Sequence, residues 1–388
     1  MDRPRYFWIG IVLALSIAAA CTIAAVSSNR RGGDSGLSPL LVTTESAPAQ
    51  PPGIPIGLDY GDTLFGADSA KIDAGFADAS AIGASWIRID LPWDGVQPSW
   101  SQSTYDWSHF DALVKAAASR GLRVLATIVD PPVWARAAAC KTDEACEPAN
   151  PMAYAAFAAL AAKRYAPVGV HDWEIWNEEN LDGFATSAKP GAAYAALLAD
   201  AYTALHAADP HALVMLGGLG MVQDEPARHW IGAYEFLTGV AAAGGLAYAD
   251  AIGVHPYDWN DLPKNGAPFT MIDSSRQSLA TVLRAYGHAA IPFWITETGA
   301  PTAGAGGVTD GPTGSGASHA TLQWQATLAQ DIVSTETADS RIEGLFWYTD
   351  TDLPNSGLYF GLRTADGTVK PVMAVLTAAI KSYRESVK

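Results

Sequence analysis

The chain has 388 residues, of which 49% are apolar and 16% charged, so it can bury a substantial core in one large domain or two ordinary ones. Its 40 acidic and 24 basic residues give a formal net charge of −16. Nucleic-acid binding draws on Lys and Arg side chains opposite phosphates, so this acidic balance argues against a nucleic-acid partner. The composition suits a soluble protein that acts on an uncharged molecule.

The N-terminal region is typical of an export or anchoring signal. Residues 6–26 form a run without charge, preceded by Arg3 and Arg5. This run is long enough to span a bilayer and longer than the apolar core of an ordinary signal peptide. We therefore expect residues 1–26 to be a signal anchor or, alternatively, a signal peptide cleaved near residues 24–27. In the first case the rest of the chain is anchored to the cell membrane on its outer side, and in the second it is secreted.

The next segment, residues 27–53, is rich in Ser, Gly and Pro and has no period of 2 or 3.6 residues. This composition predicts a disordered, flexible linker. Further along, Cys140 and Cys146 are close in sequence. Because export brings them into an oxidising compartment, we expect a disulfide that holds one loop.

From residue 54 onward, short apolar runs alternate with amphipathic segments, which is typical of a parallel sheet with crossover helices. The expected strands are 56–58, 86–89, 123–128, the stretch beginning at 173, 213–216, 251–254, the stretch beginning at 294, and 344–348. The expected helices are 71–82, 106–121, one starting after Asn150, 190–208, about 229–243, about 275–286, one ending near 334, and 372–383. Eight strands and eight helices without a second block of different composition favour an α/β fold, a single (β/α)8 TIM barrel over residues 54–388, rather than an open doubly wound sheet.

Two stretches each bring a glutamate to the end of a predicted strand. Residues 173–180 carry Asn177 and Glu178, and residues 294–299 carry Glu297. In a (β/α)8 barrel the active site lies at the carboxyl ends of the strands. A pair of carboxyl groups there is the minimum requirement for cleaving a glycosidic bond. We find no metal-binding spacing and no phosphate-binding glycine loop, so we expect no metal and no cofactor.

The combination of three motifs resembles the clan A glycoside hydrolases, which include cellulase-like, xylosidase-like and bacterial exopolysaccharide-cleaving families. The motifs are Trp-Asn-Glu ending at Glu178, His255-Pro256-Tyr257, and Trp-Ile-Thr-Glu-Thr-Gly around Glu297. The resemblance covers nearly all of residues 54–383. It implies a retaining mechanism on β-linked, or equivalently configured, glycosides of an oligo- or polysaccharide. By position, Glu178 resembles the general acid/base and Glu297 the nucleophile.

The resemblance also implies roles for neighbouring residues. Asn177 would bind the sugar 2-hydroxyl, Arg88 and Tyr257 would hold Glu297 ionised, His255 would bond to substrate, and Trp347 would lie under the sugar. Arg88 has an alternative role as the structural partner of Glu174, which we expect to point inward. Three further tryptophans follow strands, where an aromatic face can stack on a sugar ring. They are Trp93, Trp134 and Trp259.

The sequence departs from the common pattern at Glu179, because many relatives have proline after the acid/base. Strand alternation would point Glu174, Trp176 and Glu178 to one side and Glu179 to the other, which favours Glu178 as the acid. Two other functions stay open, a transglycosylase with the same carboxyl groups and a non-catalytic glycan-binding barrel. We expect a monomer. The residues do not identify the sugar or the linkage.

Overall fold

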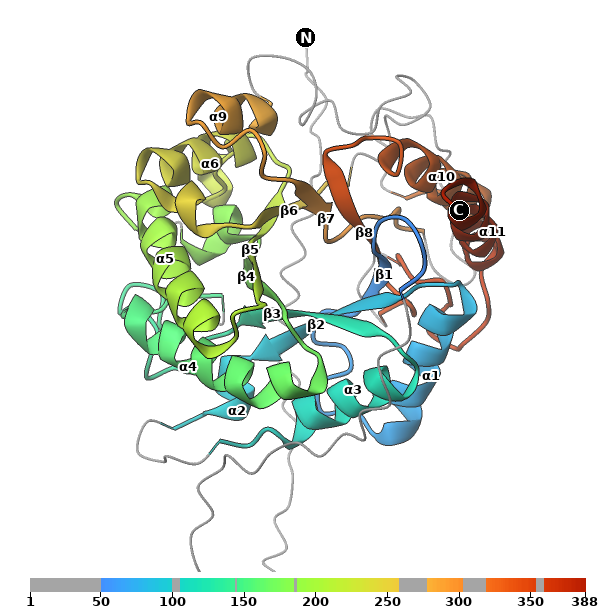
Figure 1. Cartoon of the computed structure of the whole chain (residues 1–388), viewed down its shortest axis with the longest axis horizontal. Helices are drawn as coiled ribbons and strands as arrows, with labels where there is room; N and C mark the ends of the chain where they lie inside the picture. Colours follow the sequence, from blue (N-terminus) through green and yellow to red (C-terminus); the bar gives the residue numbers. More distant parts are fainter. Residues whose placement is uncertain are drawn as a thin grey trace, which may run out of the picture.

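A computed structural model describes residues 50–99, 105–143, 145–184, 187–257, 278–302, 319–353 and 359–388. Eight parallel strands close into a barrel in chain order, from β1 to β8 and back to β1. The strands form the central ring and the helices lie outside it (Figure 1). The expected closed barrel is confirmed. The expected N-terminal anchor and nearly all of the expected linker lie outside the described residues, within which no helix is both long and apolar enough to cross a membrane.

The strands agree with the predicted ones to within a few residues. They are β1 (Ile56–Asp59), β2 (Trp86–Pro92), β3 (Arg123–Val129), β4 (Asp172–Asn177), β5 (Leu213–Gly220), β6 (Ala251–His255), β7 (Phe293–Ile295) and β8 (Ile342–Tyr348). Most are longer at their carboxyl ends than the apolar runs predicted. The polar residues there continue the strand pairing, and the apolar pattern therefore stops before the strand does.

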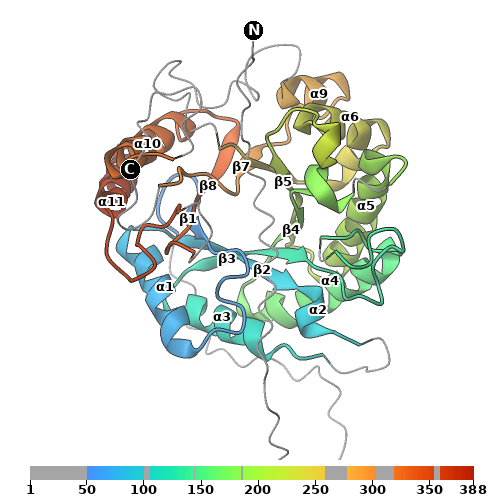
Figure 2. The same ribbon diagram turned by 180° about the vertical axis from the view of Figure 1, so that it is seen from behind.

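The helices cover the outside of the barrel, and α10 and α11 lie side by side in both views (Figure 1 and Figure 2). They are α1 (Ser69–Ala81), α2 (Trp93–Val96), α3 (Ser108–Ser119), α4 (Pro151–Tyr165), α5 (Pro190–Ala208), α6 (Ala233–Ala242), α9 (Leu279–Ala285), α10 (Leu322–Glu336) and α11 (Pro371–Ser386). Short turns of other helical types are η1 (Ala166–Val168), η2 (Glu179–Gly183), η3 (Pro226–Arg228) and η4 (Gly245–Tyr248).

Local sequence explains where several helices begin. The predicted cap Asn150 accepts a hydrogen bond from the backbone of Met152, and Pro151 occupies the first turn of α4. The helix predicted from residue 229 begins instead at Ala233, because His229 has a left-handed backbone with φ 58° that ends η3. Helix α2 was not predicted, since a single turn has too few residues to show a period.

The inside of the barrel at the amino ends of the strands is filled by large aromatic rings. Trp86, Trp294 and Phe346 are buried there with Leu125 and Met215. Glycines on other strands leave room for these rings. A Cβ added at Gly344 would lie 2.3 Å from Trp294, and one at Gly57 would lie 2.5 Å from Phe346. These packed side chains fill the barrel interior at the amino ends of the strands. Space for a polar site is therefore left at the carboxyl ends.

The predicted disulfide is present. Cys140 and Cys146 are joined in the segment between β3 and α4, with their Cα atoms 5.4 Å apart. Their loop is further held by a backbone bond from Ala137 to Glu147.

The amino end of the described chain is held against the last helix. Tyr383 accepts a hydrogen bond from the backbone of Ile54 at 2.8 Å, and Arg384 donates to the carbonyl oxygens of Pro52 and Ile54. Both side chains lie in the last turn of α11, at the end of the barrel opposite the carboxyl ends of the strands. The packed unit therefore begins at about Pro52, slightly before the expected boundary at residue 54.

We expect a chain that starts at Gln50 to be more stable than one that starts at Ile54. The shorter chain lacks one acceptor of the buried Arg384 guanidinium, and a lost bond to a charged group costs about 1–3 kcal/mol. Denaturant unfolding of the two chains measures the difference. Equal free energies of unfolding would show that the contacts at Pro52 contribute nothing.

Candidate active site

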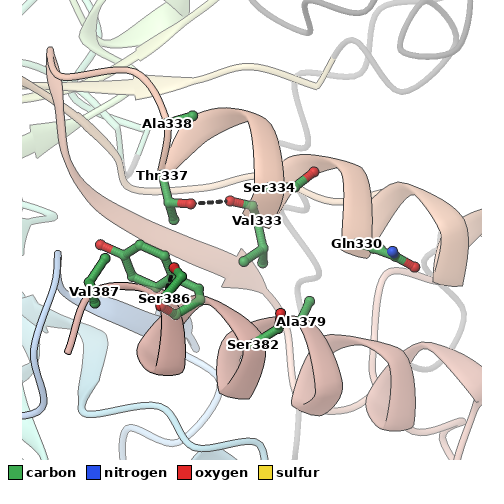
Figure 3. Close-up of a pocket in the computed structure, with 10 residues that line it drawn as sticks. Gln330, Val333, Ser334, Thr337, Ala338, Ala379, Ser382, Ser386 and Val387 are labelled. Atoms are coloured by element: carbon green, nitrogen blue, oxygen red, sulfur yellow. Dashed lines mark hydrogen bonds between the residues drawn. The ribbon is translucent and has the colours of Figure 1, made fainter.

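A pocket opens at the carboxyl ends of the strands, where the predicted catalytic residues converge. It is lined by Tyr60, Gly61, Asp62, Thr63, Asp90, Asn177, Glu178, Tyr257, Glu297, Tyr348 and Phe360. A larger hollow lies elsewhere, between α10 and α11 (Figure 3). Tyr383 is the only ionisable side chain among the residues that line that second hollow. The first pocket is therefore the candidate active site.

Arg88 is the central cation beneath this pocket. It comes from β2 and is 1% exposed. Its Nε donates to Glu174 at 2.5 Å, its Nη1 to Glu297 at 2.9 Å, and its Nη2 to Asn177 at 2.7 Å. Nη1 also lies 3.1 Å from the Asp59 carboxylate. The two roles weighed for Arg88 are therefore both present, because one guanidinium pairs with Glu174 and holds Glu297.

His255, the last residue of β6, lies between the two glutamates. Its Nδ1 is 3.1 Å from Glu178 and 3.6 Å from Glu297, and its Nε2 is 3.1 Å from the hydroxyl of Thr296. The ring occupies space that Gly218 leaves open, since a Cβ there would lie 1.9 Å from Nε2. Burial lowers the pKa of His255 to about 4, so the imidazole is neutral at pH 7. It acts as a hydrogen-bonding partner rather than as a second cation.

Glu178 and Glu297 face each other across the pocket. Carboxylate oxygens of the two residues lie within 4.8 Å of one another and of a nitrogen of His255. These three side chains are also, among the described residues, the one group of His and carboxylate ligands close enough to hold a metal ion. No metal motif was found in the sequence. Because both nitrogens of His255 already have partners, we interpret the cluster as an acid/base pair with a hydrogen-bonding histidine.

The route by which Glu178 reaches the pocket differs from the prediction. Regular alternation would put Trp176 on the same side as Glu174, but Trp176 has φ 77° and packs outside the barrel against Tyr154 and Phe184. Glu178 also has a left-handed backbone, with φ 48°. These two irregular residues turn the chain at the end of β4. The choice of Glu178 for the pocket agrees with the structure, whereas the argument from alternation was wrong.

Glu179 points away from the pocket and is fully buried. A Cβ added at Gly217 would lie 2.5 Å from its carboxylate, which places this group beside β5. Neither oxygen finds a hydrogen-bonding partner among the described residues. Burial, followed by the charges of Glu174 and Glu178, raises the pKa of Glu179 well above its usual range. This raised pKa favours the protonated, neutral form of Glu179 behind the site.

An aromatic wall, defined here as Tyr257, Tyr348 and Phe360, forms one side of the pocket. The ring of Phe360 meets those of Tyr257 and Tyr348 edge-on, with centroids 5.3 and 5.7 Å apart. The Tyr257 hydroxyl donates to Glu297 at 2.7 Å. Arg88 and Tyr257 thus contact Glu297 as the resemblance implied.

Trp347 does not lie in the pocket, which corrects its expected role under the sugar. It is 3% exposed and faces the outer core, and its Nε1 donates to the carbonyl of Phe360. Along β8 the residues that point into the barrel are Phe346 and then Tyr348. Parity along the strand therefore gives Tyr348 the position expected for Trp347.

Trp93 and Trp134 do not line the pocket either. Trp93 is 1% exposed and stacks on Phe157, so it has no face free for a sugar. Trp93 begins helix α2, and this helical turn directs its ring toward Phe157 in the surrounding helices instead of toward the pocket. Trp134 is half-buried, meets Trp93 edge-on and donates to the carbonyl of Gln97. Trp259 lies outside the described residues.

The site holds more carboxyl groups than cations, and the pKa values of two of these carboxyl groups are raised. Burial raises the pKa of Glu297 to about 7, and the charges of Asp59 and Glu178 add to this rise while Arg88 opposes it. Burial likewise raises the pKa of Asp59 to about 6, although Arg88 lies beside it. Arg88 thus favours the ionised form of Glu297, the direction that the resemblance implied, although burial outweighs this effect. Arg88 is shared among Asp59, Glu174 and Glu297, so it only partly offsets the desolvation of each.

Sequence comparison identifies the family. The family model for cellulase, glycosyl hydrolase family 5, matches residues 47–338. The chain belongs to glycosyl hydrolase family 5. The resemblance to clan A is thereby confirmed, and the protein is a glycosidase. A search of curated protein sequences finds no match.

Solved structures of other glycoside hydrolases share the fold of this family 5 protein. A GH5_18 enzyme from Streptomyces cattleya, solved with GlcNAc, has 16% identity and a TM-score of 0.63, covering 87% of this chain and 82% of its own. A family 39 glycoside hydrolase from Bacteroides cellulosilyticus WH2 has 20% identity and a TM-score of 0.59, covering 86% of this chain. The match spans 64% of that protein's length. Xylanase 10B from Thermotoga petrophila RKU-1 has 14% identity and a TM-score of 0.58, covering 86% and 95%.

The sequence analysis did not identify seven of the eleven residues that line the pocket of this family 5 protein. The missed residues are Tyr60, Gly61, Asp62, Thr63, Asp90, Tyr348 and Phe360. Asp90 shares its strand and parity with Arg88, and that periodicity could have found it. Phe360 lies beyond the last strand in an irregular segment, where no period places a side chain.

The buried acid Glu179 gives a testable dependence of stability on pH. Its pKa is raised in the folded protein, so unfolding releases its proton once the pH exceeds the usual value near 4.5, and wild-type stability falls as the pH rises from there. Glu179→Gln removes this titration. We expect the variant to gain stability relative to wild type at pH 8 compared with pH 4, measured by denaturant unfolding.

Glu343, which is exposed on β8, provides the matched control. Glu343→Gln makes the same chemical change in solvent, and we expect it to show no such gain. A stability difference for Glu179→Gln that stays constant between pH 4 and pH 8 would mean that Glu179 is charged in the folded protein.

The pKa of Glu297 predicts the acid side of the pH–activity profile. If Glu297 attacks as a carboxylate, kcat/KM should rise with pH through an apparent pKa near 7. Tyr257→Phe removes a donor to the charged form and should move this limb to higher pH, whereas Asp59→Asn removes a nearby negative charge and should move it to lower pH. Shifts in the same direction for both variants would contradict this account.

Proposed function

We propose that this family 5 protein is a retaining glycosidase that cleaves β-linked glycosides of an oligo- or polysaccharide by double displacement. Glu297 is the nucleophile and Glu178 the general acid/base. The spacing of the two carboxyl groups carries this proposal. Retaining enzymes hold them at about 5–5.5 Å and inverting enzymes at about 6.5–9.5 Å, to admit a water. One carboxylate oxygen of Glu178 and one of Glu297 lie within 4.8 Å of each other, and this close approach supports the shorter class.

The contacts of each glutamate match its proposed role. Glu297 receives donors from Arg88 and Tyr257, which favour the charged form that attacks. Glu178 lies 3.1 Å from Nδ1 of His255, and because this histidine is neutral at pH 7 the contact does not oppose the protonated form of Glu178. Asn177 is held by Arg88 at the pocket edge, where its amide can bond to a sugar hydroxyl.

In the first step the Glu297 carboxylate attacks the anomeric carbon. The bond from that carbon to the leaving oxygen breaks, and the proton of Glu178 passes to that oxygen. Formation of the glycosyl ester removes the negative charge of Glu297. In the second step Glu178 accepts a proton from water, the water oxygen bonds to the anomeric carbon from the vacated face, and Glu297 leaves as a carboxylate. Two inversions at one carbon restore its configuration.

The same proposal includes an extracytoplasmic location, with residues 1–26 as a membrane anchor or a cleaved signal. Pro52 and Ile54 are held at the end of α11, opposite the pocket. A tether that enters at this end would leave the pocket facing away from the membrane, toward a surface or extracellular polysaccharide.

The deciding experiment is the anomeric outcome of the reaction. We expect proton NMR of the first-formed sugar from an aryl β-glycoside, recorded before mutarotation, to show the β-anomer. The α-anomer appearing first would exclude Glu297 as nucleophile. Disaccharide or longer products formed in excess over free sugar would favour transglycosylation. Binding of an oligosaccharide without turnover of any aryl glycoside would favour the non-catalytic alternative.

Glutamine variants assign the two glutamates. Glu297→Gln should lower kcat on the order of 10³-fold or more while substrate still binds. Glu178→Gln should slow substrates with poor leaving groups far more than activated aryl glycosides, which need little acid assistance. Glu179→Gln is the matched control and should show no dependence on the leaving group. If Glu179→Gln shows that dependence instead of Glu178→Gln, the acid has been misassigned.

A further inference from the structure

Two buried side chains outside the pocket connect the segments that follow β7 and β8. Lys370 precedes α11 and is 2% exposed, and Gln325 lies in α10 and is fully buried. The glycosidase mechanism uses neither of them directly. Each of them donates hydrogen bonds to one residue after β7 and to at least one residue after β8. These segments carry the nucleophile Glu297 and, from the aromatic wall, Phe360.

The Lys370 ammonium has three acceptors. Its Nζ lies 2.6 Å from Asp352, 3.0 Å from the hydroxyl of Thr302, and 2.9 Å from the carbonyl of Tyr359. Thr302 follows β7, whereas Asp352 and Tyr359 follow β8. All three donor positions of the ammonium are therefore used, and the charge is paired in the interior. Thr302 adds a direct link, because its backbone N–H donates to the carbonyl of Tyr359 at 3.0 Å.

Gln325 makes a second connection between the same two segments. Its Nε2 donates to the carbonyl of Ala300, after β7, at 2.9 Å and to the carbonyl of Phe360, after β8, at 3.1 Å. Trp347 also donates to the Phe360 carbonyl. The backbone of Tyr359 and Phe360 is thus fixed by side chains from three separate elements.

Phe360 passes this fixed geometry to the nucleophile. Its ring packs edge-on against Tyr257, with centroids 5.3 Å apart, and the Tyr257 hydroxyl donates to Glu297 at 2.7 Å. A displacement of the Phe360 backbone would release the ring that holds Tyr257 in place. The path from the buried ammonium to the nucleophile therefore runs through one carbonyl, two aromatic rings and one hydrogen bond.

A buried ion pair is a poor choice for stability alone, because desolvation opposes its formation and an apolar pair of similar volume often serves as well. Lys370 and Asp352 nevertheless occupy this position, each at 2% exposure. What an apolar pair cannot do is bond to Thr302 and Tyr359 in fixed directions. Directional bonding to two separate segments is thus the property that the ion pair adds.

We infer that Lys370, assisted by Gln325, is a positioning residue that sets Tyr257 against Glu297 through Phe360. The inference rests on the proposed role of Glu297 as nucleophile. Loss of this geometry should lower kcat/KM on the order of tenfold or more, since small misplacements of reacting groups are costly. The loss should fall mainly on kcat. It should also move the acid limb of kcat/KM to higher pH, as Tyr257→Phe does.

The test uses the full chain with Lys370→Met combined with Asp352→Asn, so that no unpaired charge is left buried. The Asn side chain can still accept the backbone bond that Gly361 donates to Asp352. Gln325→Met is a second, uncharged variant that removes only the two bonds to Ala300 and Phe360. Arg384→Met is the matched control, because Arg384 is a buried cation at the other end of the same helix, 8% exposed. Kinetics are measured well below the melting temperature of each variant.

We expect the Lys370→Met/Asp352→Asn and Gln325→Met proteins to lose kcat/KM and shift the acid limb, and Arg384→Met to lose stability alone. In a Tyr257→Phe background the effect of the Lys370 double substitution should shrink, because both act on one contact. Unchanged kinetics in both positioning variants, or full additivity with Tyr257→Phe, would overturn the inference.

A readout independent of turnover separates this inference from the proposed function. In protein with 4-fluorophenylalanine at position 360, the fluorine resonance should move or broaden on the Lys370 double substitution and stay unchanged in Arg384→Met. An unchanged resonance overturns the inference even if the enzyme is active. A moved resonance in a protein that turns over no glycoside supports the positioning of Phe360 and contradicts the proposed function.

Discussion

Arg88 is the only guanidinium among the described residues that bonds to Glu297, and it is shared. It bonds to Glu174 and Asn177 on β4, to Asp59 on β1, and to the nucleophile position after β7. A buried cation needs acceptors, and buried carboxylates need a cation, so these four elements must meet at one height in the barrel. The buried rings of Trp86, Trp294 and Phe346 lie on the side of Arg88 toward the amino ends of the strands, and the pocket lies on the side toward their carboxyl ends. The pocket can be polar because the charges beneath it are already paired.

Sharing one cation among several carboxylates has a chemical consequence. Burial raises the pKa of Glu297 to about 7 and that of Asp59 to about 6, even though Arg88 contacts both. His255 adds no positive charge, since burial keeps it neutral. Glu297 and Asp59 therefore both titrate close to neutral pH. Tyr257, whose own orientation depends on Phe360, supplies the remaining donor to Glu297 and connects the electrostatics to the packing of the β8 segment.

The site also shows why the two glutamates after β4 differ. Glu178 and Glu179 are adjacent in sequence, yet one lines the pocket and the other is buried behind it, where a raised pKa favours its neutral form. The irregular backbone at Trp176 and Glu178 separates them. Membership of family 5 fits the barrel, and a family 39 glycoside hydrolase and xylanase 10B share this fold. Asp62, in the segment after β1, and Asp90, on β2, line the same pocket as Glu178.

The sequence by itself determined the barrel, the order of its strands, the family and the two glutamates that meet in the pocket. These depend on alternating apolar runs and on short motifs, and both are local properties that a chain displays in order. Tertiary structure alone decided which aromatic rings face the pocket. Trp347 and Tyr348 are adjacent and equally suited to a sugar, and only the parity of β8 against the barrel interior separates them. The single turn of α2 buried Trp93, and the sharing of Arg88 set the pKa of Glu297, because both depend on atoms that are distant in sequence and close only after folding.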